Sequence, residues 1–300
     1  MMKIDLTEGT YILAISGGVD SMVMLDIIAK SYLNKKNYKF IVGHFDHGIR
    51  NDSNLDSELV YKICNKLGID FESEKANLGP KASESLARQK RYDFLFNIRK
   101  KHKAKALITA HHKDDVIETA VFNLLRGTGR KGLTTLNRNS EIIRPMVGYD
   151  KQTIIEYALK NNLIWREDST NQNLKYSRNL IRLQKLKNLT KDQQAKLVKI
   201  INRQEEVNNE LDKLMKSLLE KFGHETKINR KFLNNLPDKI SAELIAEWLR
   251  RNNLRDFDRK TIERIQKGSK IGITGSQYDI KHNYYVNVTR DYLALNVRER

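Results

Sequence analysis

The sequence predicts an α/β fold with a Rossmann-like, mostly parallel sheet, and two observations support this. Short apolar runs suited to buried strands occur at 11–15, 40–44 and 106–110, with weaker candidates at 70–74 and 142–144. Helical patterns lie between and after them, at about 20–34, 54–67, 82–102, 113–126 and 150–162. Strands that alternate with helices are typical of parallel sheets, whose ligands bind beyond the carboxyl ends of the strands.

The pattern changes after about residue 190. No Gly or Pro occurs between Asp192 and Phe222, and apolar residues recur there at helical spacing, which predicts one long linker helix. Short helices at about 240–251 and 258–266 and a closing hairpin over 284–297 follow. We therefore expect a first domain at 1–190, a linker helix at 191–222 and a small α+β accessory domain at 223–300.

Composition limits the class of protein. The chain has one cysteine, Cys64, which excludes a disulfide framework and metal sites that need paired cysteines. Cys64 falls inside a predicted helix, and we interpret it as a packing residue. No apolar stretch is long enough to span a membrane and no secretory signal is recognisable, so we expect a cytoplasmic protein with no membrane association.

The net charge of +18 is spread over both parts of the chain. Residues 1–190 hold 32 Lys and Arg against 21 Asp and Glu, and residues 191–300 hold 23 against 16. Because neutralisation of phosphates by Lys and Arg supplies much of the affinity for nucleic acids, this distribution favours a polyanionic partner. The alternative is a lysine-rich composition that serves only solubility.

The most informative segment joins the first predicted strand to the first helix. Adjacent glycines allow a tight turn that brings backbone N–H groups to an anion, and the helix N-terminus adds its positive dipole end. Serine hydroxyls can donate to phosphate oxygens, and an aspartate suits a Mg²⁺ ion held between it and the phosphates. No Gly-Lys-Ser/Thr follows, which argues against the usual P-loop chemistry. The segment consists of Ser16, Gly17, Gly18, Val19, Asp20 and Ser21.

A second polar group follows the fourth strand. On a helix, His111, Asp115 and Glu118 would share one face, and Val116, Ile117, Ala120 and Leu124 would be buried on the other. The polar face could hold Mg²⁺, bind the ammonium group of an amino acid, or accept a proton from an attacking amine. Acidic residues are favoured near the N-terminus of any helix, so a solvated helix start is the alternative. The position directly after a strand of this fold favours a functional site instead.

The segment from strand through SGGVDS to helix resembles the loop of the PP-loop, or N-type, ATP pyrophosphatases, which implies cleavage of ATP between its α- and β-phosphates. Further segments look like those of the tRNA(Ile)-lysidine synthase family, in a short form, and the likeness runs through residues 11–182. These segments are HFDHGIRNDSNLDS, LARQKRYDFL, TAHHKDDVIETAVFNLLRGTGRKGL and REDSTNQNLKYSRNLIR.

The resemblance implies a carbon–nitrogen ligase that uses ATP and Mg²⁺. ATP would adenylate the carbon-2 oxygen of the wobble cytidine in the CAU anticodon of an isoleucine tRNA. The ε-amine of free L-lysine would then attack that carbon, giving lysidine. The first domain would be the PP-loop catalytic domain and the accessory domain would bind tRNA, and no obligate protein partner is evident.

The resemblance also implies roles for individual residues. The loop residues Ser16 to Ser21 would bind ATP, together with His44, Asp46 and His47 at the end of the second strand, where adenosine is commonly held. His111, Asp115, Glu118 and Asp20 would be catalytic, with Asp20 and Asp115 near Mg²⁺, and the general base is not assigned. The substrate or tRNA side would comprise Arg88, Arg91, Arg126, Gly127, Thr128, Gly129, Asp168, Asn171, Arg178 and Asn179.

Three other functions compete with this interpretation. A sulfur-inserting tRNA thiolase of the PP-loop type usually needs two or more cysteines. A small-molecule adenylating ligase leaves the charge of +18 unexplained. An RNA-binding protein with a degenerate ATP site conflicts with the intact loop and the intact polar face.

Overall fold

The computed structural model describes residues 2–48, 53–76, 78–79, 83–137, 141–166, 189–254, 257–281 and 283–298. The chain divides into two compact units, Met1–Gln204 and Glu205–Arg300. Each unit has its own five-stranded sheet and its own hydrophobic core.

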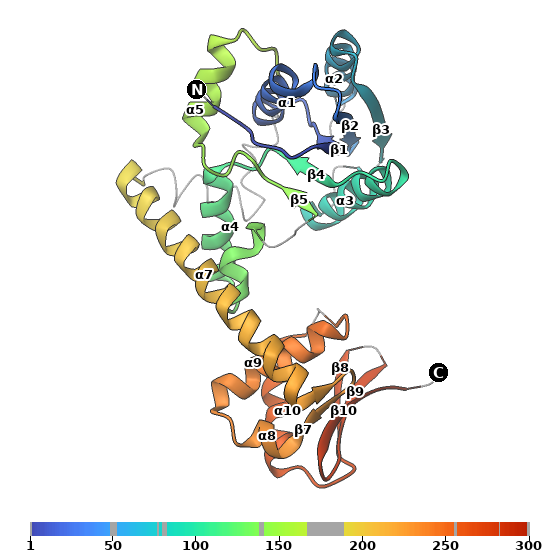
Figure 1. Cartoon of the computed structure of the whole chain (residues 1–300), viewed down its shortest axis with the longest axis vertical. Coiled ribbons are helices and arrows are strands. Elements are labelled where there is room, and N and C mark those ends of the chain that lie inside the picture. Colours follow the sequence, from blue (N-terminus) through green and yellow to red (C-terminus); the bar gives the residue numbers. More distant parts are fainter. Residues whose placement is uncertain are drawn as a thin grey trace. The chain divides into compact units, whose positions relative to one another are not determined.

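The N-terminal unit is built on a parallel sheet (Figure 1). The predicted α/β class and all five predicted strands are confirmed, and the second strand extends two residues beyond its predicted limits at each end. The strands lie in the order β3-β2-β1-β4-β5. Their bounds are β1 (Gly9–Ala14), β2 (Tyr38–Asp46), β3 (Asp70–Lys75), β4 (Ala106–Thr109) and β5 (Ile142–Ile143).

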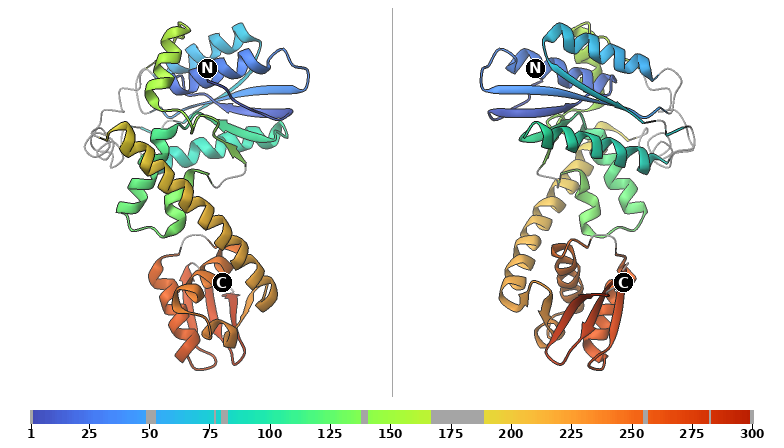
Figure 2. Two further views of the ribbon diagram at one scale, coloured as in Figure 1. Left: turned by 60° about the vertical axis from the view of Figure 1, so that its left-hand side comes forward. Right: turned by 90° about the vertical axis from the view of Figure 1, so that its right-hand side faces the viewer.

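Helices cover both faces of this sheet (Figure 2). One face packs against α1 (Val19–Tyr32), α2 (Asn54–Leu67) and α5 (Lys151–Lys160), through a core that includes Leu13, Val42 and Ile154. The other face packs against α3 (Glu84–Lys101), where Ile12 and Ile41 meet Leu95. Because successive strand residues point to opposite faces, the apolar runs in the sequence supply both cores.

The order of the strands reverses between β1 and β4. The chain runs outward from β1 through β2 and β3, and then returns to place β4 and β5 on the other side of β1. Tyr11 pairs with Ala106 and Ala14 pairs with Thr109 in parallel register. The loops that follow β1 and β4 therefore leave the same edge of the sheet side by side, at the point where ligands bind in such folds.

The helix after the fourth strand is confirmed as α4 (Lys113–Leu125), but it begins two residues after His111. His111 lies in the loop before α4, so the expected stacking of His111, Asp115 and Glu118 on one helical face is wrong for the histidine. Leu124 is 61% exposed and not buried, although Val116, Ile117 and Ala120 are buried as expected. A short 3-10 helix, η1 (Arg130–Asn137), packs on α4 and was not predicted, because glycines interrupt the sequence there.

The predicted long helix is confirmed as α7 (Lys191–Phe222), and the division between the two units falls inside it. In the N-terminal unit, Ile201 packs with Val116 and Ala120 of α4. In the C-terminal unit, Met215 and Leu219 join the core. The helix therefore contributes to the packing of each unit.

The C-terminal unit has an antiparallel sheet in the order β6-β7-β10-β9-β8. The predicted hairpin is confirmed as β9 and β10, and the two predicted helices as α9 and α10. The shorter elements were not predicted, because two to five residues carry little periodic signal. The elements are β6 (Gly223–His224), β7 (Lys227–Asn229), α8 (Arg230–Asn234), α9 (Asp238–Arg251), α10 (Arg259–Ile271), β8 (Gln277–Lys281), β9 (Tyr284–Val288) and β10 (Tyr292–Val297). No helix among the described residues has both the length and the apolar character needed to cross a membrane.

The packing role of Cys64 can be tested by its reactivity. Cys64 lies on the buried face of α2, and burial raises the pKa of its thiol to about 12. We expect no reaction with a thiol-specific reagent in the native protein and one reactive thiol per chain in denaturant. Rapid stoichiometric labelling of the native chain would show that the core around α2 is open.

Candidate active site

The loop after β1 has the geometry of an anion-binding turn. Gly17 has a φ of +91°, which lies in the left-handed region that favours glycine. The Ser21 hydroxyl donates to the Gly18 carbonyl at 2.9 Å and accepts from the Ser16 backbone N–H at 3.2 Å. Gly18 is the N-cap of α1 and caps it with no side chain, so the first N–H groups of this helix face the loop without a capping oxygen.

The loop after β4 carries two histidines with different surroundings. The His111 ring Nδ1 lies 2.8 Å from the Thr109 hydroxyl. His112 is the N-cap of α4, and its backbone N–H donates to the Asp115 carboxylate at 2.8 Å. Asp115 therefore has a structural role at the start of the helix in addition to any chemical one.

The two loops line one shared cavity of about 620 Å³. Its wall includes Ser16, Gly18, Val19, Asp20 and Ser21 from the first loop, and Thr109, Ala110, His111 and Asp115 from the second. Arg91 of α3 also lines the cavity. Three predicted residues of these segments do not line it: Gly17 of the first loop, Arg88 of α3 and Glu118 of α4.

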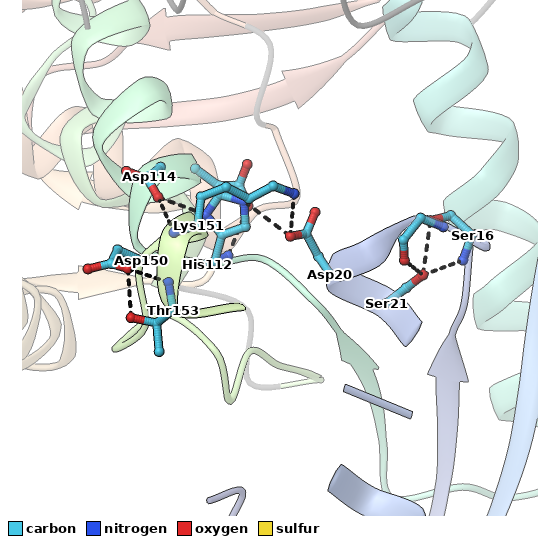
Figure 3. Close-up of polar contacts among 10 residues, drawn as sticks. Ser16, Asp20, Ser21, His112, Asp114, Asp150, Lys151 and Thr153 are labelled. Atoms are coloured by element: carbon cyan, nitrogen blue, oxygen red, sulfur yellow. Dashed lines mark hydrogen bonds and ion pairs between the residues drawn. The ribbon is translucent and has the colours of Figure 1, made fainter. Parts of the chain in front are cut away.

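Polar contacts made by Lys151 and His112 with acidic side chains link the two loops (Figure 3). The Lys151 Nζ, from the first turn of α5, lies 2.6 Å from the Asp20 carboxylate. The His112 Nε2 lies 3.8 Å from the Asp20 carboxylate and 3.5 Å from that of Asp115, and its Nδ1 lies 3.4 Å from the Asp114 carboxylate. Lysine and histidine thus bridge acidic groups that come from α1 and α4.

The charges around the two histidines shift their pKa values in opposite directions. Burial lowers the pKa of His111 to about 3, and the nearby cations of Arg144, Arg88 and Arg91 add to the effect, so its ring is neutral at pH 7. Burial also disfavours the charged form of His112, but Asp114, followed by Asp115 and Asp20, outweighs it and raises the pKa of His112. The loop after β4 therefore holds a neutral His111 ring that lines the cavity and, next to it, a buried His112 whose charged form is favoured.

One of the three residues predicted at the end of the second strand lines the cavity. His47 does so together with Gly43 and Phe45, whereas His44 and Asp46 do not. The His44 Nδ1 lies 2.9 Å from the Ile15 carbonyl, and the Asp46 carboxylate accepts from the Gly48 N–H at 2.8 Å. Alternate residues of a strand point to opposite sides of the sheet, so neighbours in the sequence need not line the same cavity.

The two arginines predicted on α3 lie near the cavity wall that contains His111, and Arg91 is the one that lines it. The guanidinium groups of Arg88 and Arg91 lie 5.0 Å and 5.6 Å from the centre of the Tyr92 ring. Tyr92 itself lines the cavity, and Arg144 beside it adds a third cation that the sequence analysis missed. This wall has the positive charge that suits an anionic substrate.

The glycine-containing exit of α4 does not reach the cavity. Arg126 is the C-cap of α4, and its guanidinium lies 4.6 Å from the Phe122 ring centre. Gly127 has a φ of +69°, and the Thr128 hydroxyl donates to the Asn123 carbonyl at 2.9 Å. Together with Gly129 these residues form a helix C-terminal turn.

Of the predicted closing motif, which begins at Arg166, the structure describes only the first residue. Asp168, Asn171, Arg178 and Asn179 lie outside the described residues. The segment before them does approach the first loop, because the Arg166 backbone N–H donates to the Gly17 carbonyl at 3.0 Å. The Arg166 side chain also pairs with Asp56 at 2.7 Å, and Trp165 lines the cavity.

Comparisons with known proteins agree with this geometry. A model of the PP-loop domain matches residues 2–189, which is more than half of the chain. The chain belongs to the PP-loop family. This family uses ATP, and the anion-binding turn after β1 is the loop for which the family is named.

Relatives of this chain include proteins named tRNA(Ile)-lysidine synthase. A tRNA(Ile)-lysidine synthase from Thermotoga maritima is 40% identical over 185 residues, which cover 59% of this chain and 44% of that protein. One from Francisella philomiragia is 29% identical over 296 residues, which cover 95% of this chain and 72% of that protein. The chain therefore spans less than half the length of the Thermotoga relative.

A solved PP-loop structure shows the same fold. The U34-tRNA thiolase NcsA from Methanococcus maripaludis, solved with its 4Fe-4S cluster, has a TM-score of 0.57 and is 18% identical to this chain. The match covers 67% of this chain and 73% of the thiolase. At this identity the likeness concerns the fold alone.

Three contacts of the site were missed for a common reason: Lys151 with Asp20, His112 with Asp20, and Arg166 with Asp56. The two residues of each pair lie far apart in the chain, and sequence spacing gives no sign of such pairs. The available signal for Lys151 was topological, since it begins the helix that follows the fifth strand.

The charge on His112 predicts a pH-dependent contribution to stability. The folded state raises the pKa of His112 above the ordinary 6.5, so its charged form stabilises the fold below about pH 6.5. This stabilisation is lost as the pH rises through the folded-state pKa. We expect His112→Gln to lower the free energy of unfolding by roughly 1–3 kcal/mol at pH 6 and by less at pH 9.

Chemical denaturation at several pH values measures this difference. His224→Gln, which changes an exposed histidine of the C-terminal unit, serves as the matched control and should show no pH-dependent loss. A loss in His112→Gln that is equal at pH 6 and pH 9 would contradict an ionised His112.

Proposed function

We propose that this chain is an ATP-dependent ligase that joins lysine to carbon 2 of the wobble cytidine in an isoleucine tRNA with a CAU anticodon. The observation that carries the proposal is the single cavity shared by the PP-loop turn and the His111–Asp115 segment. Support also comes from the relatives named tRNA(Ile)-lysidine synthase, one of which matches 95% of this chain.

The reaction needs two displacements in one place. The carbon-2 oxygen of cytidine attacks the α-phosphorus of ATP, the bond to the β-phosphate oxygen breaks, and pyrophosphate leaves. The lysine ε-amine then attacks carbon 2 and expels AMP, and the amine loses a proton. Adenylation converts a poor leaving oxygen into a good one, and a site that holds both reactants near the α-phosphate supplies the orientation.

The two walls of the cavity suit these two tasks. Backbone N–H groups and the hydroxyls of Ser16 and Ser21 would bind phosphate oxygens at the first loop. The ring of His111 is neutral at pH 7, because its pKa is about 3, so it can accept a hydrogen bond from the amine but is a weak base. Asp115 lines the same cavity and can bind the ammonium group of lysine. His111, Asp115 and Glu118 are the candidates for the general base.

A Mg²⁺ ion fits this donor set. Within the described ranges no group of three or more His, Cys, Asp or Glu could hold a metal by itself. Mg²⁺ in nucleotide sites commonly takes one or two carboxylates together with phosphate oxygens and water, and Asp20 and Asp115 on the cavity wall can provide them. The ion would neutralise charge on the phosphates.

The distribution of charge supports tRNA as the partner. The unit Met1–Gln204 holds 36 Lys and Arg against 22 Asp and Glu, and Glu205–Arg300 holds 19 against 15. Most of the positive excess thus belongs to the unit with the cavity, where Arg88, Arg91 and Arg144 lie near His111. In this proposal the C-terminal unit is an accessory domain for tRNA.

A PP-loop thiolase is the second candidate, because the NcsA structure shares the fold. Cys64 is the single cysteine of the chain and is fully buried, so it offers no sulfur chemistry at the cavity. Lysine ligation needs no cysteine and is therefore favoured.

A ligation assay tests the proposal. We expect radiolabelled lysine to enter a CAU-anticodon tRNA transcript only when ATP is present, and not to enter a transcript whose wobble cytidine is replaced by uridine. Protein that binds ATP but transfers no label to the cytidine transcript would refute the lysine assignment.

The role of Asp115 is tested by Asp115→Asn. This change keeps an oxygen that can accept from the His112 N–H, so α4 stays capped while the negative charge is removed. We expect ligation to fall at least about 100-fold with little change in stability. The matched control is Asp258→Asn, which alters the capping aspartate of α10 and should ligate normally. Ligation by Asp115→Asn within twofold of wild type would remove Asp115 from the mechanism.

A further inference from the structure

The PP-loop turn contains no basic side chain of its own. Residues Ser16 to Ser21 offer hydroxyls, N–H groups and one carboxylate to a ligand that carries several negative charges. In P-loop proteins, a lysine within the loop reaches the β- and γ-phosphates. In this chain a cation for the phosphates has to come from another element that borders the cavity.

Among the described residues, three lysine and arginine side chains line the cavity, and they differ in position. Arg166 pairs with Asp56, which is 8% exposed, and its backbone holds Gly17. Arg91 lies on α3, on the wall of His111 and Tyr92. Lys151 differs from both, because its Nζ contacts Asp20 within the PP-loop segment itself.

The backbone of Lys151 is firmly held. Asp150 caps α5 by accepting from the Thr153 N–H at 2.8 Å and from the Thr153 hydroxyl at 2.7 Å. The Lys151 N–H donates to the Asp114 carboxylate at 2.8 Å, which ties α5 to α4 (Figure 3). The side chain remains 29% exposed, so its ammonium group can reach a ligand in the cavity while the backbone stays fixed.

The two ends of the cavity differ in polarity. Gly43, Phe45 and Leu95 form an apolar part on the α3 side of the sheet, and Lys151 enters from α5 on the opposite side. An adenine ring prefers the apolar part, and the phosphates then extend across the PP-loop turn. The far end of the triphosphate would meet Lys151.

We propose that Lys151 binds the β- and γ-phosphates of ATP and holds the pyrophosphate as it leaves. The inference rests on the proposed use of ATP and adds a residue to that site. When ATP binds, the Lys151 ammonium group donates to phosphate oxygens, and its present hydrogen bond to the Asp20 carboxylate is either kept or replaced. Lys151 then supplies from α5 the charge that a P-loop lysine supplies from its own loop.

Binding measurements test the assignment without depending on turnover. The affinities of ATP, AMP and inorganic pyrophosphate are measured by calorimetry for wild type, Lys151→Met and Lys151→Arg. We expect Lys151→Met to weaken ATP and pyrophosphate by roughly 10- to 100-fold, because a charge-assisted hydrogen bond is lost, and to leave AMP within about twofold. Lys151→Arg keeps the charge and should recover most of the affinity.

Lys30→Met is the matched control. Lys30 also pairs with an aspartate, Asp26, at 2.7 Å, but it does not line the cavity, so its loss should leave all three affinities unchanged. If Lys151→Met weakens AMP as much as ATP, Lys151 only shapes the loop and the assignment is overturned. Unchanged binding of ATP by Lys151→Met also overturns it.

A double-mutant cycle with Asp20→Asn separates contact with phosphate from support of Asp20. A lysine that contacts phosphate still matters when Asp20 is neutral, so Lys151→Met should weaken ATP further in the Asp20→Asn background. No further weakening would overturn the assignment.

The outcomes distinguish this inference from the proposed function. Lys151-dependent binding of ATP and pyrophosphate in a protein that transfers no lysine to RNA would support the role of Lys151 and refute lysine ligation. Wild-type protein that binds neither ATP nor pyrophosphate would overturn both.

Discussion

The parallel pairing of β4 with β1 is the constraint on which the rest of the site depends. Both strands end at the same edge of the sheet, with Ala14 beside Thr109, so the loops that follow them must emerge together. The helices that begin after these loops leave their polar first turns at the shared edge. A cavity with an anion-binding turn on one wall and a His–Asp segment on another follows directly from the strand order.

Electrostatic contrast across the cavity follows from the same arrangement. Burial, aided by the nearby arginines, lowers the pKa of His111 and keeps that ring neutral, whereas the carboxylates near His112 outweigh its burial and favour its charged form. The Lys151 and His112 side chains, from α5 and the start of α4, lie next to the carboxylate of Asp20 in α1. These contacts link α1, α4 and α5, so the geometry of the PP-loop turn depends on residues far from it in the chain. A site that must bind a polyanion and also accept a proton benefits from such separation of charge.

Local patterns allowed much of this architecture to be predicted. The five strands, the helices between them, the long helix α7 and the PP-loop turn all have signals within a few residues, such as periodicity or adjacent glycines. Errors arose where a side chain's direction or partner depends on packing. His44 and Asp46 lie at the end of β2, as expected, but do not line the cavity. His111 precedes the helix on which it was expected. Lys151 and Arg166 could not be assigned, because only the folded sheet brings them to the first loop.

The central claim is that one nucleotide spans the two loops. An experimental structure of the protein with a non-hydrolysable ATP analogue, methylene-bridged between the α- and β-phosphates, tests it most directly. The account predicts phosphates on the N–H groups that follow Ser16, with the α-phosphate turned toward the His111 and Asp115 side of the cavity. An analogue bound elsewhere, or one whose α-phosphate points away from that side, would contradict the account.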